Sequence, residues 1–351
     1  MHMADALISP AVGGTMWCAS AGLIGYSARK LRQEGDDRKV PLMGVLGAFV
    51  FAAQMINFSI PGTGSSGHLG GGMLLAILLG PYAALLVMAS ILTVQALFFA
   101  DGGLLALGCN IFNLGFIPCF LVYPLVYRSI AGRNQTKQRI LVASLVAAIL
   151  GLQLGAFSVV LETVASGISE LPFGTFVLLM QPIHLAIGVV EGLATAAVVG
   201  FVWQARPEIL GTIVSSRPKI KTATGRVAAV FLVSTAIIGG VLSWFASTAP
   251  DGLEWAMQRT SGKAELAASS NTHAALAVVQ SKTAWLPDYD LPVADRPVAG
   301  TDARQPAWPS VSAGKSLSGL VGGGLTLIII LLFGWALSRR RVSWLEGDRH
   351  A

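Results

Sequence analysis

The stretch LGGGMLLAILLGPYAALLVMASILTVQALFF (residues 69–99) decides what kind of fold this chain adopts. It contains no charged side chain, and only Gly80-Pro81 interrupts it. A transmembrane helix needs about 20 apolar residues, so the part after Pro81 is long enough to span a bilayer and the part before Gly80 is too short. We therefore expect 69–99 to enter the membrane and return, with its broken backbone covered by neighbouring protein.

Similar apolar runs recur on both sides of this stretch. They lie at about 11–29, 42–58, 107–131, 138–166, 176–204, 226–247 and 318–338. The 351 residues are 54% hydrophobic and 12% charged, and the mean hydropathy is +0.67. In soluble domains roughly a quarter of residues are charged. The sequence predicts an all-α integral membrane protein, a polytopic helical bundle of about seven spans followed by a C-terminal module of about two spans.

The basic residues predict the orientation of the bundle. They gather at 29–39, 128–139, 206–226 and 339–341, whereas 58–68, 100–106 and 167–175 contain no Lys or Arg. Cytoplasmic loops carry the excess of Lys and Arg, so we expect a multi-pass protein of the bacterial inner membrane with its N-terminus outside and its C-terminus in the cytoplasm. The net charge of +6 is then explained by topology, and we expect no nucleic-acid partner.

The chain begins MHMADALISP, without the basic region of a cleaved signal peptide, and we expect Met1 to be the mature end. A free amine at Met1 and the amide and imidazole nitrogens of His2 can close two fused chelate rings on one metal ion. Planar nitrogen sites favour Ni(II) or Cu(II). The alternative is that His2 is a chance polar residue at a frayed terminus.

A fourth nitrogen must come from elsewhere in the chain, and His68 is the natural donor. It closes the glycine-rich loop PGTGSSGHLGGG (61–72), which the charge pattern places on the same outer side as His2. The alternative is a histidine at a helix start that bonds only to the backbone. The cysteines form no CxxC pair, so neither a disulfide framework nor a thiolate zinc site is expected.

Polar residues within the apolar runs are costly and often functional. For His184, Glu191, Glu162 and Gln54 we expect supporting or structural roles rather than direct metal ligation. Residues that orient a metal loop are expected near the histidines, because partners of the ligands fix their geometry. The candidates for this role are Asn57, Ser66, Asn110 and Asn113. In the first span, Gly14, Cys18 and Gly22 form a smooth face that suits packing inside the bundle or docking of a second membrane protein.

Nucleotide motifs are absent in any usable form. The loop 62–67 matches GxGxxG but lacks the strand and βαβ unit that the dinucleotide fingerprint requires. Gly314-Lys315-Ser316 resembles the end of a phosphate-binding loop, but Pro309 stands where its first glycine should be. We therefore expect a chain that is not an enzyme and takes energy from a partner.

The start MHMADALISP resembles the MHIADG start of the CbiM/NikM family, the substrate-capture components of cobalt and nickel energy-coupling-factor transporters. Residues 57–113 and HLAIGVVEGLATA (184–196) resemble two further family blocks, and PDGLEWA (250–256) is similar to the signature of the NikN-type module. The likeness implies a fused chain: a metal-binding membrane domain at 1–205, a cytoplasmic linker at 206–225, and a PDGLE module at 226–351 with an extracytoplasmic segment at 248–317.

This resemblance implies a planar four-nitrogen site made by Met1, His2 and His68. Met3 and Ala6 depart from the family start, and neither change removes a donor. The transported substrate is expected to be Ni²⁺, which the PDGLE module favours, with Co²⁺ as the alternative. The implied partners are a transmembrane coupling protein of the NikQ/CbiQ type, ATPase subunits of the NikO/CbiO type, and the lipid bilayer.

Other classes remain open from the sequence. The chain could be a cobalt-specific importer component, a self-sufficient secondary metal transporter, or a structural or sensory membrane protein with an incidental N-terminal histidine.

Overall fold

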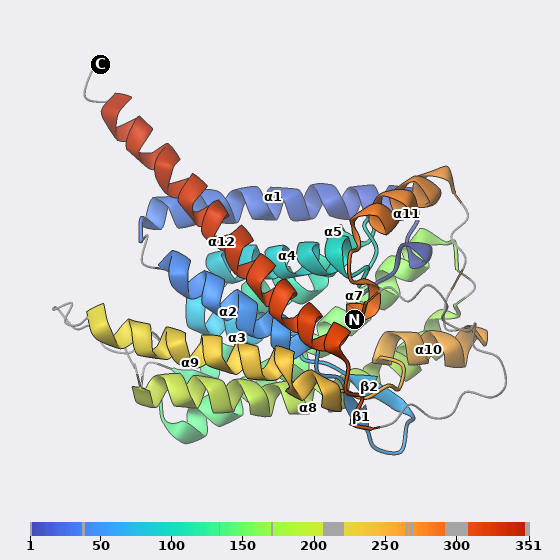
Figure 1. The fold of residues 1–351 in the computed structure, drawn as a ribbon. Helices are drawn as coiled ribbons and strands as arrows, with labels where there is room; N and C mark the ends of the chain where they lie inside the picture. The colour runs from blue at the N-terminus through green and yellow to red at the C-terminus, as the bar shows by residue number, and fades with distance from the viewer. Residues whose placement is uncertain are drawn as a thin grey trace.

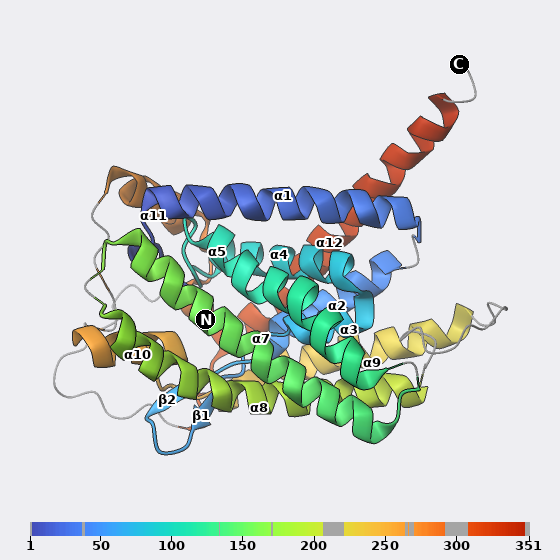
Figure 2. The same cartoon turned by 180° about the vertical axis from the view of Figure 1, so that it is seen from behind.

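The computed structural model describes residues 2–36, 39–132, 134–169, 171–205, 221–263, 266, 270–291 and 308–347. Long helices run roughly side by side to form one bundle (Figures 1 and 2). In chain order the helices are η1 (Asp5–Leu7), α1 (Pro10–Glu34), α2 (Lys39–Gln54), α3 (Gly72–Leu79), α4 (Pro81–Phe98), α5 (Leu107–Ile111), η2 (Phe112–Tyr127), α6 (Arg128–Ala131), α7 (Lys137–Ser166), α8 (Phe173–Ala205), α9 (Lys221–Gly240), η4 (Leu242–Phe245), α10 (Gly252–Ser261), α11 (Asn271–Thr283), η5 (Pro287–Tyr289) and α12 (Ala313–Gly347).

Residue 80 divides the stretch that decides the fold. Gly80 has φ 81°, a left-handed value that glycine adopts without steric cost, and Pro81 opens α4 at a position where its missing N–H is not needed. The helices α3 and α4 pack against each other and are buried along most of their length. The expected interruption is therefore present, and α3 is a short buried helix.

Within the described residues, five helices are long and apolar enough to cross a membrane: Pro81–Phe98, Leu107–Ala131, Lys137–Ser166, Phe173–Ala205 and Ala313–Ala336. Lys39–Gln54 and Gly225–Gly240 are apolar but shorter. The structure thus supports a multi-pass helical membrane protein, and the count of about seven plus two spans stays a prediction.

The chain is mostly helical, as predicted, and one short element departs from this pattern. A two-stranded antiparallel hairpin, β1 (Phe58–Ile60) and β2 (Ser65–Gly67), interrupts the helices and pairs Phe58 with Gly67. Its turn is stabilised by a hydrogen bond from the Thr63 amide to the Ile60 carbonyl, 3.3 Å long. The glycines that suggested an irregular loop supply the turn between the strands, where Gly62 and Gly64 have positive φ.

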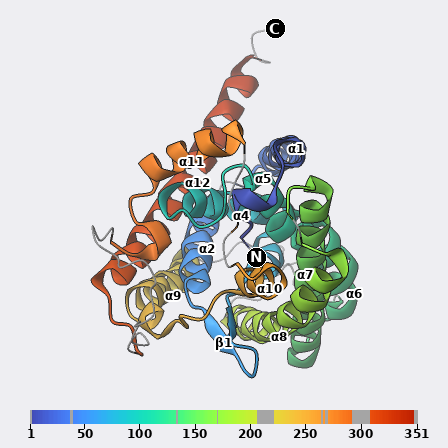
Figure 3. The ribbon, with the colours of Figure 1, turned by 90° about the vertical axis from the view of Figure 1, so that its right-hand side faces the viewer.

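One end of the bundle gathers segments that are far apart in sequence. The N-terminal segment, the β1–β2 hairpin, α10 and α11 all lie at this end, on the right in Figure 1 and facing the viewer in Figure 3. We call it the site pole. The C-terminal ends of α1 and α8 and the start of α2 lie at the opposite pole. The expected outer segment 248–317 therefore contains helices, of which α10 and α11 cover the site pole.

Candidate metal site

The two predicted histidine ligands meet at the site pole. The rings of His2 and His68 are stacked, with centroids 5.0 Å apart and planes inclined by 14°. The His2 side chain is 6% exposed. Met1 lies outside the described residues. The structure therefore brings together the pair of imidazoles that the sequence placed on one side of the membrane.

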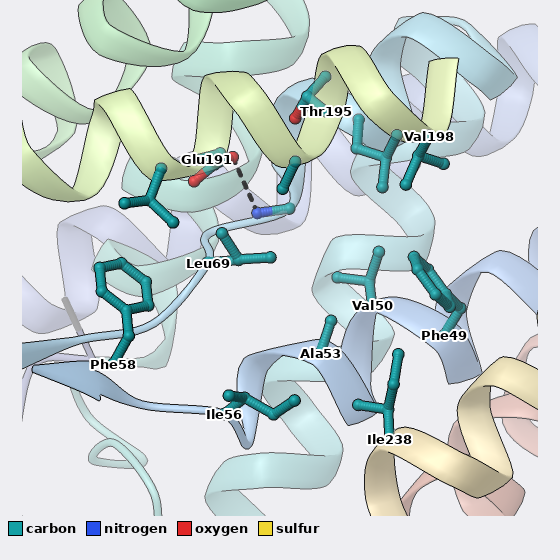
Figure 4. A pocket seen from close by; sticks show the side chains of 14 residues that line it. Phe49, Val50, Ala53, Ile56, Phe58, Leu69, Glu191, Thr195, Val198 and Ile238 are labelled. Atoms are coloured by element: carbon teal, nitrogen blue, oxygen red, sulfur yellow. Dashed lines mark hydrogen bonds between the residues drawn. The ribbon is translucent and has the colours of Figure 1, made fainter. Parts of the chain in front are cut away.

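The backbone after β2 fixes the position of His68. Glu191 on α8 accepts hydrogen bonds from the amides of Gly70 and Gly71, at 2.7 and 3.0 Å. Gln54 on α2 donates to the Gly70 carbonyl at 2.8 Å. Figure 4 shows the Glu191 carboxylate directed from α8 at this loop, beside an apolar cavity of about 270 Å³. Glu191 and Gln54 thus anchor the histidine loop in the bundle.

The segment that carries His2 is fixed in the same way. Asn110 accepts from the Met3 amide at 2.8 Å and donates to the Met3 carbonyl at 3.3 Å, so one side-chain amide holds both backbone groups. The Gly103 amide also donates to the Met3 carbonyl, at 2.8 Å. Asn110 is 1% exposed. It therefore orients the residue that follows His2.

Asp5 ties the N-terminal segment to the turn after α4. Its Oδ1 accepts from the amides of Leu105 and Ala106, at 2.7 and 3.0 Å. A methyl group on Gly103 would lie 1.8 Å from this Asp5 oxygen, so only glycine fits there. Gly103, in the Asp-Gly-Gly turn at 101–103, therefore leaves the space that the N-terminal segment occupies.

Asp101, in the same turn, faces His2 of the stacked histidine pair. Its Oδ1 lies 3.0 Å from Nδ1 of His2. Burial opposes ionisation of Asp101, but the neighbouring His2 ring and hydrogen bonds from His2 and Tyr289 hold the pKa of this carboxyl below its usual range. Because a carboxylate only accepts, Nδ1 of His2 donates to it. Nε2 of His2 is buried and has no hydrogen-bond partner among the described residues.

His68 is prepared for metal binding in a different way. Its Nδ1 lies 3.1 Å from the Leu69 carbonyl, which fixes the proton on Nδ1 and leaves the lone pair on Nε2. Burial lowers the pKa of His68 to about 3. The ring is therefore neutral at physiological pH, which is the form that ligates metal.

The remaining predicted residues surround the pair at greater distance. Asn113 on η2 donates to Glu162 on α7 at 2.7 Å and to the Met3 sulfur at 3.9 Å, so it links the N-terminal segment to both helices. His184 Nδ1 lies 2.8 Å from the Met180 carbonyl on its own helix. Glu162 and His184 thus both bond to groups of the protein, and their structural role stays a prediction.

Ser66 and Asn57 contact the C-terminal part of the chain. The Ser66 hydroxyl donates to the Ala249 carbonyl at 2.7 Å, and its amide donates to Pro250 at 2.8 Å. The Asn57 carbonyl accepts from the Ser247 amide at 2.7 Å. These residues hold the segment that leads into α10, with PDGLE at 250–254, against the hairpin that precedes His68.

Sequence reasoning did not single out four residues of this site: Asp5, Asp101, His273 and Tyr289. For Asp101 the sequence indicates only that it lies in the segment 100–106, which lacks Lys and Arg. Its position, directly after an apolar span and before two glycines, was a usable signal for a buried carboxylate. His273 and Tyr289 gave none, because their partners lie 188 or more residues away in the sequence.

The described side chains alone do not complete a metal site. No group of three or more His, Cys, Asp and Glu side chains is arranged to hold a metal within the described part of the chain. The paired imidazoles of His2 and His68 supply two nitrogens. Any planar site here therefore needs backbone nitrogens from the N-terminus, as the sequence predicts.

A multi-pass helical bundle with paired imidazoles at one pole defines the class: a membrane component of transition-metal uptake. The chain belongs to the CbiM family, described as the cobalt uptake substrate-specific transmembrane region, which it matches over residues 2–209. Residues 225–339 match the PDGLE domain.

Individual relatives agree with this assignment. The chain is 32% identical over 343 residues to a putative fused nickel transport protein NikMN of Archaeoglobus fulgidus, covering 97% of this chain and 98% of that protein. It is 32% identical to the fused nickel transport protein NikMN of Rhodobacter capsulatus, covering 60% of this chain and 64% of that one. A crystal structure of a truncated transition metal transporter is similar, with a TM-score of 0.52, 30% identity, and coverage of 58% of this chain and 99% of that one.

Proposed function

We propose that this chain captures Ni(II) at the outer face of the membrane, in a planar site of four nitrogens. The donors are the Met1 amine, the amide and Nδ1 of His2, and Nε2 of His68. The observation that carries the proposal is the stacked pair of His2 and His68, whose backbone segments are each anchored by buried polar groups. Co(II) is the alternative substrate, since both ions accept imidazole and amine ligands.

His2 must turn its ring to close this chelate. Nδ1 of His2 donates to Asp101 in the structure described, and only Nδ1 is near enough to its own backbone amide to close a six-membered ring with the metal. A half-turn about the Cβ–Cγ bond directs Nδ1 to the metal and brings Nε2 to the Asp101 side. The Asp101 carboxylate then accepts from Nε2, the usual outer partner of a metal-bound histidine.

Energy for transport comes from partner subunits in this proposal. The family membership supports a coupling protein and ATPases of the NikQ/CbiQ and NikO/CbiO types. The small-residue face of α1 suits such docking, because Cys18 is exposed and a methyl group on Gly14 or Gly22 would meet no atom within 4 Å. A self-sufficient secondary transporter would take up metal without these partners, and uptake by cells with and without the ATPases separates the two.

Topology supports capture from outside. The C-terminal end of α1 and the N-terminal ends of α2 and α7 lie at the pole opposite the site (Figures 1 and 2), and basic residues occur in these end turns. The positive-inside rule makes that pole cytoplasmic and the site pole extracytoplasmic. In this orientation the C-terminus lies in the cytoplasm.

The test is metal content and absorbance of the purified protein after loading with nickel. We expect one Ni(II) per chain with the yellow, diamagnetic spectrum of a planar four-nitrogen site. His2→Ala, His68→Ala and a chain extended by one residue before Met1 each lose a donor, and should lose high-affinity binding.

His350→Ala is the matched control, since it removes a histidine of the C-terminal tail and should bind as the unchanged chain does. Unchanged nickel affinity in the His2 variant and the extended chain would overturn the assignment of the site.

A further inference from the structure

Residues 270–291 of the C-terminal part cross the site pole and contact the segments that carry the metal site. This strap, as we call it, contains α11 and η5 (Figures 1 and 3). It touches the N-terminal segment at one end and the turn after α4 at the other. Its contacts are polar and directional, and they comprise two anchors and a third contact between them.

The first anchor of the strap is His273, which is 2% exposed. Its Nε2 lies 3.1 Å from the Asp5 carbonyl and 2.9 Å from the Ile8 carbonyl. Carbonyl oxygens only accept, so Nε2 carries a proton and donates to both. Its Nδ1 lies 2.6 Å from the hydroxyl of Ser270, the N-cap of α11. His273 therefore joins α11 to the residues that directly follow the His2 segment.

The second anchor is Tyr289, whose hydroxyl donates to Oδ2 of Asp101. The other oxygen of the same carboxylate holds His2 at 3.0 Å. The Tyr289 ring stacks on Phe99, with centroids 4.9 Å apart and planes inclined by 17°, which directs the hydroxyl at Asp101. A chain of contacts thus runs from Tyr289 through Asp101 to a proposed metal ligand.

Backbone strain is concentrated at this second anchor. Within the described residues the non-glycine positions with positive φ are Ala100, Asp288 and Tyr289, at 54°, 54° and 58°. Such conformations persist only where the surrounding structure enforces them, and they cluster at functional sites. Two amides of the strap, on Leu286 and Asp288, bond to the carbonyls of Phe98 and Phe99 and hold the strained turns together.

A third contact lies between the two anchors. The Gln280 side chain donates to the Ala96 carbonyl at 2.9 Å and to the Gly102 carbonyl at 2.8 Å. Gly102 is next to Asp101, and a methyl group on it would lie 3.4 Å from Cβ of His2. The strap thus bonds to backbone carbonyls before and after Asp101, in the turn that faces His2.

We propose that His273 and Tyr289 are positioning residues of the metal site, supplied by the C-terminal module. Tyr289 fixes the Asp101 carboxylate that orients His2, and His273 holds the N-terminal segment in place over His68. The strap keeps the bound ion enclosed and slows its release. This inference rests on the proposed function for its metal readout.

The first test measures nickel release into an excess of chelator from the full chain. Tyr289→Phe keeps the ring stacking and removes the hydroxyl, and should release nickel about tenfold faster, the lower end of the effect of losing an outer-shell partner. The nickel spectrum should stay that of the unchanged chain, because no ligand is lost. Tyr26→Phe is the matched control, since it removes a tyrosine hydroxyl from an exposed position on α1.

The second variant pair isolates His273. His273→Leu removes the donor and should also speed release, whereas His273→Gln retains a side-chain N–H near the Asp5 and Ile8 carbonyls and should restore slow release. Thermal unfolding of each variant checks that it is folded. Tyr289→Phe and His273→Gln conserve shape, so the proposal stays testable if the leucine variant fails to fold.

Hydrogen exchange of the metal-free protein tests the strap without nickel. The amides of Met3 and Leu7 should exchange faster in His273→Leu and at unchanged rates in Tyr26→Phe. Wild-type rates of both nickel release and exchange in His273→Leu and Tyr289→Phe would overturn the proposal. If the unchanged chain binds no nickel in a planar site, the proposed function fails, and the exchange measurement still decides whether the strap holds the N-terminal segment.

Discussion

At the residue scale, the two histidines of the site are held in different states. His2 donates to an ionised Asp101, whereas His68 faces a backbone carbonyl and is kept neutral by burial, with its pKa lowered to about 3. We call the loop that carries His68 closed as it lies in the structure, and open when it moves away and exposes His68 to water. In the open loop the pKa of His68 returns to about 6.5. The closed loop therefore binds fewer protons than the open one between these values.

This difference predicts the direction of a pH effect. Protonation of His68 favours the open loop, so the stability of the closed loop is fully present above about pH 6.5 and declines below it, by up to about tenfold in the closed-to-open ratio per pH unit. We expect the thermal midpoint of the metal-free protein to fall between pH 7.5 and 5 more steeply in the unchanged chain than in His68→Gln. Equal slopes would show that His68 is not held neutral.

At the element scale, the loop between β2 and α3 depends on α8. The Glu191 carboxylate accepts hydrogen bonds from the amides of Gly70 and Gly71, which lie directly before the first turn of α3 and have no partner within that helix.

Replacement of Glu191 by glutamine tests this anchor. The amide offers one acceptor oxygen to two N–H groups and leaves one unpaired, which costs about 1–3 kcal/mol. We expect Glu191→Gln to bind nickel about tenfold more weakly while keeping the same spectrum, measured by competition with a chelator. Gln204→Glu, the reverse change at the exposed end of α8, should leave nickel affinity unchanged. An unaltered affinity in Glu191→Gln would mean that the loop is held without this carboxylate.

At the scale of the whole molecule, the C-terminal module is packed into the bundle and over its site. The helices α9 and α12 both lie against α2. A methyl group on Gly319 would lie 2.4 Å from the Gly239 carbonyl oxygen, and one on Gly322 would lie 2.0 Å from the Phe51 ring. Such close approach through small residues is how helices associate in lipid.

This packing predicts that the covalent link is dispensable. A chain cut between residues 206 and 220 and co-expressed as two pieces should co-purify in mild detergent, because α9 and α12 pack against α2. Gly322→Leu should separate the pieces, since its side chain collides with the Phe51 ring on α2 of the other piece. Leucine at Gly200, where an added methyl group would meet nothing within 4 Å, is the control. Separation of the unmodified pieces would contradict the prediction.

The sequence alone determined most of the architecture and the identity of the site histidines. Apolar runs are local properties, and helices suited to a membrane follow from them directly. The orientation that the basic segments indicate stays a prediction. The break at Gly80-Pro81 and the pairing of His2 with His68 could be predicted from local properties as well. The hairpin could not, because an extended pairing over three-residue strands has no periodic pattern long enough to recognise.

Only the tertiary structure decided what supports the site. Asp101 meets Tyr289 and Asp5 meets His273 across 188 and 268 residues of sequence, and no local pattern relates such pairs. The same holds for Ser66, a predicted support of the metal loop, which the structure bonds to the segment that contains PDGLE. The proposed ligands can be recognised from single residues of the sequence. The residues that support these ligands depend on which distant segments the packed helices bring to the site pole.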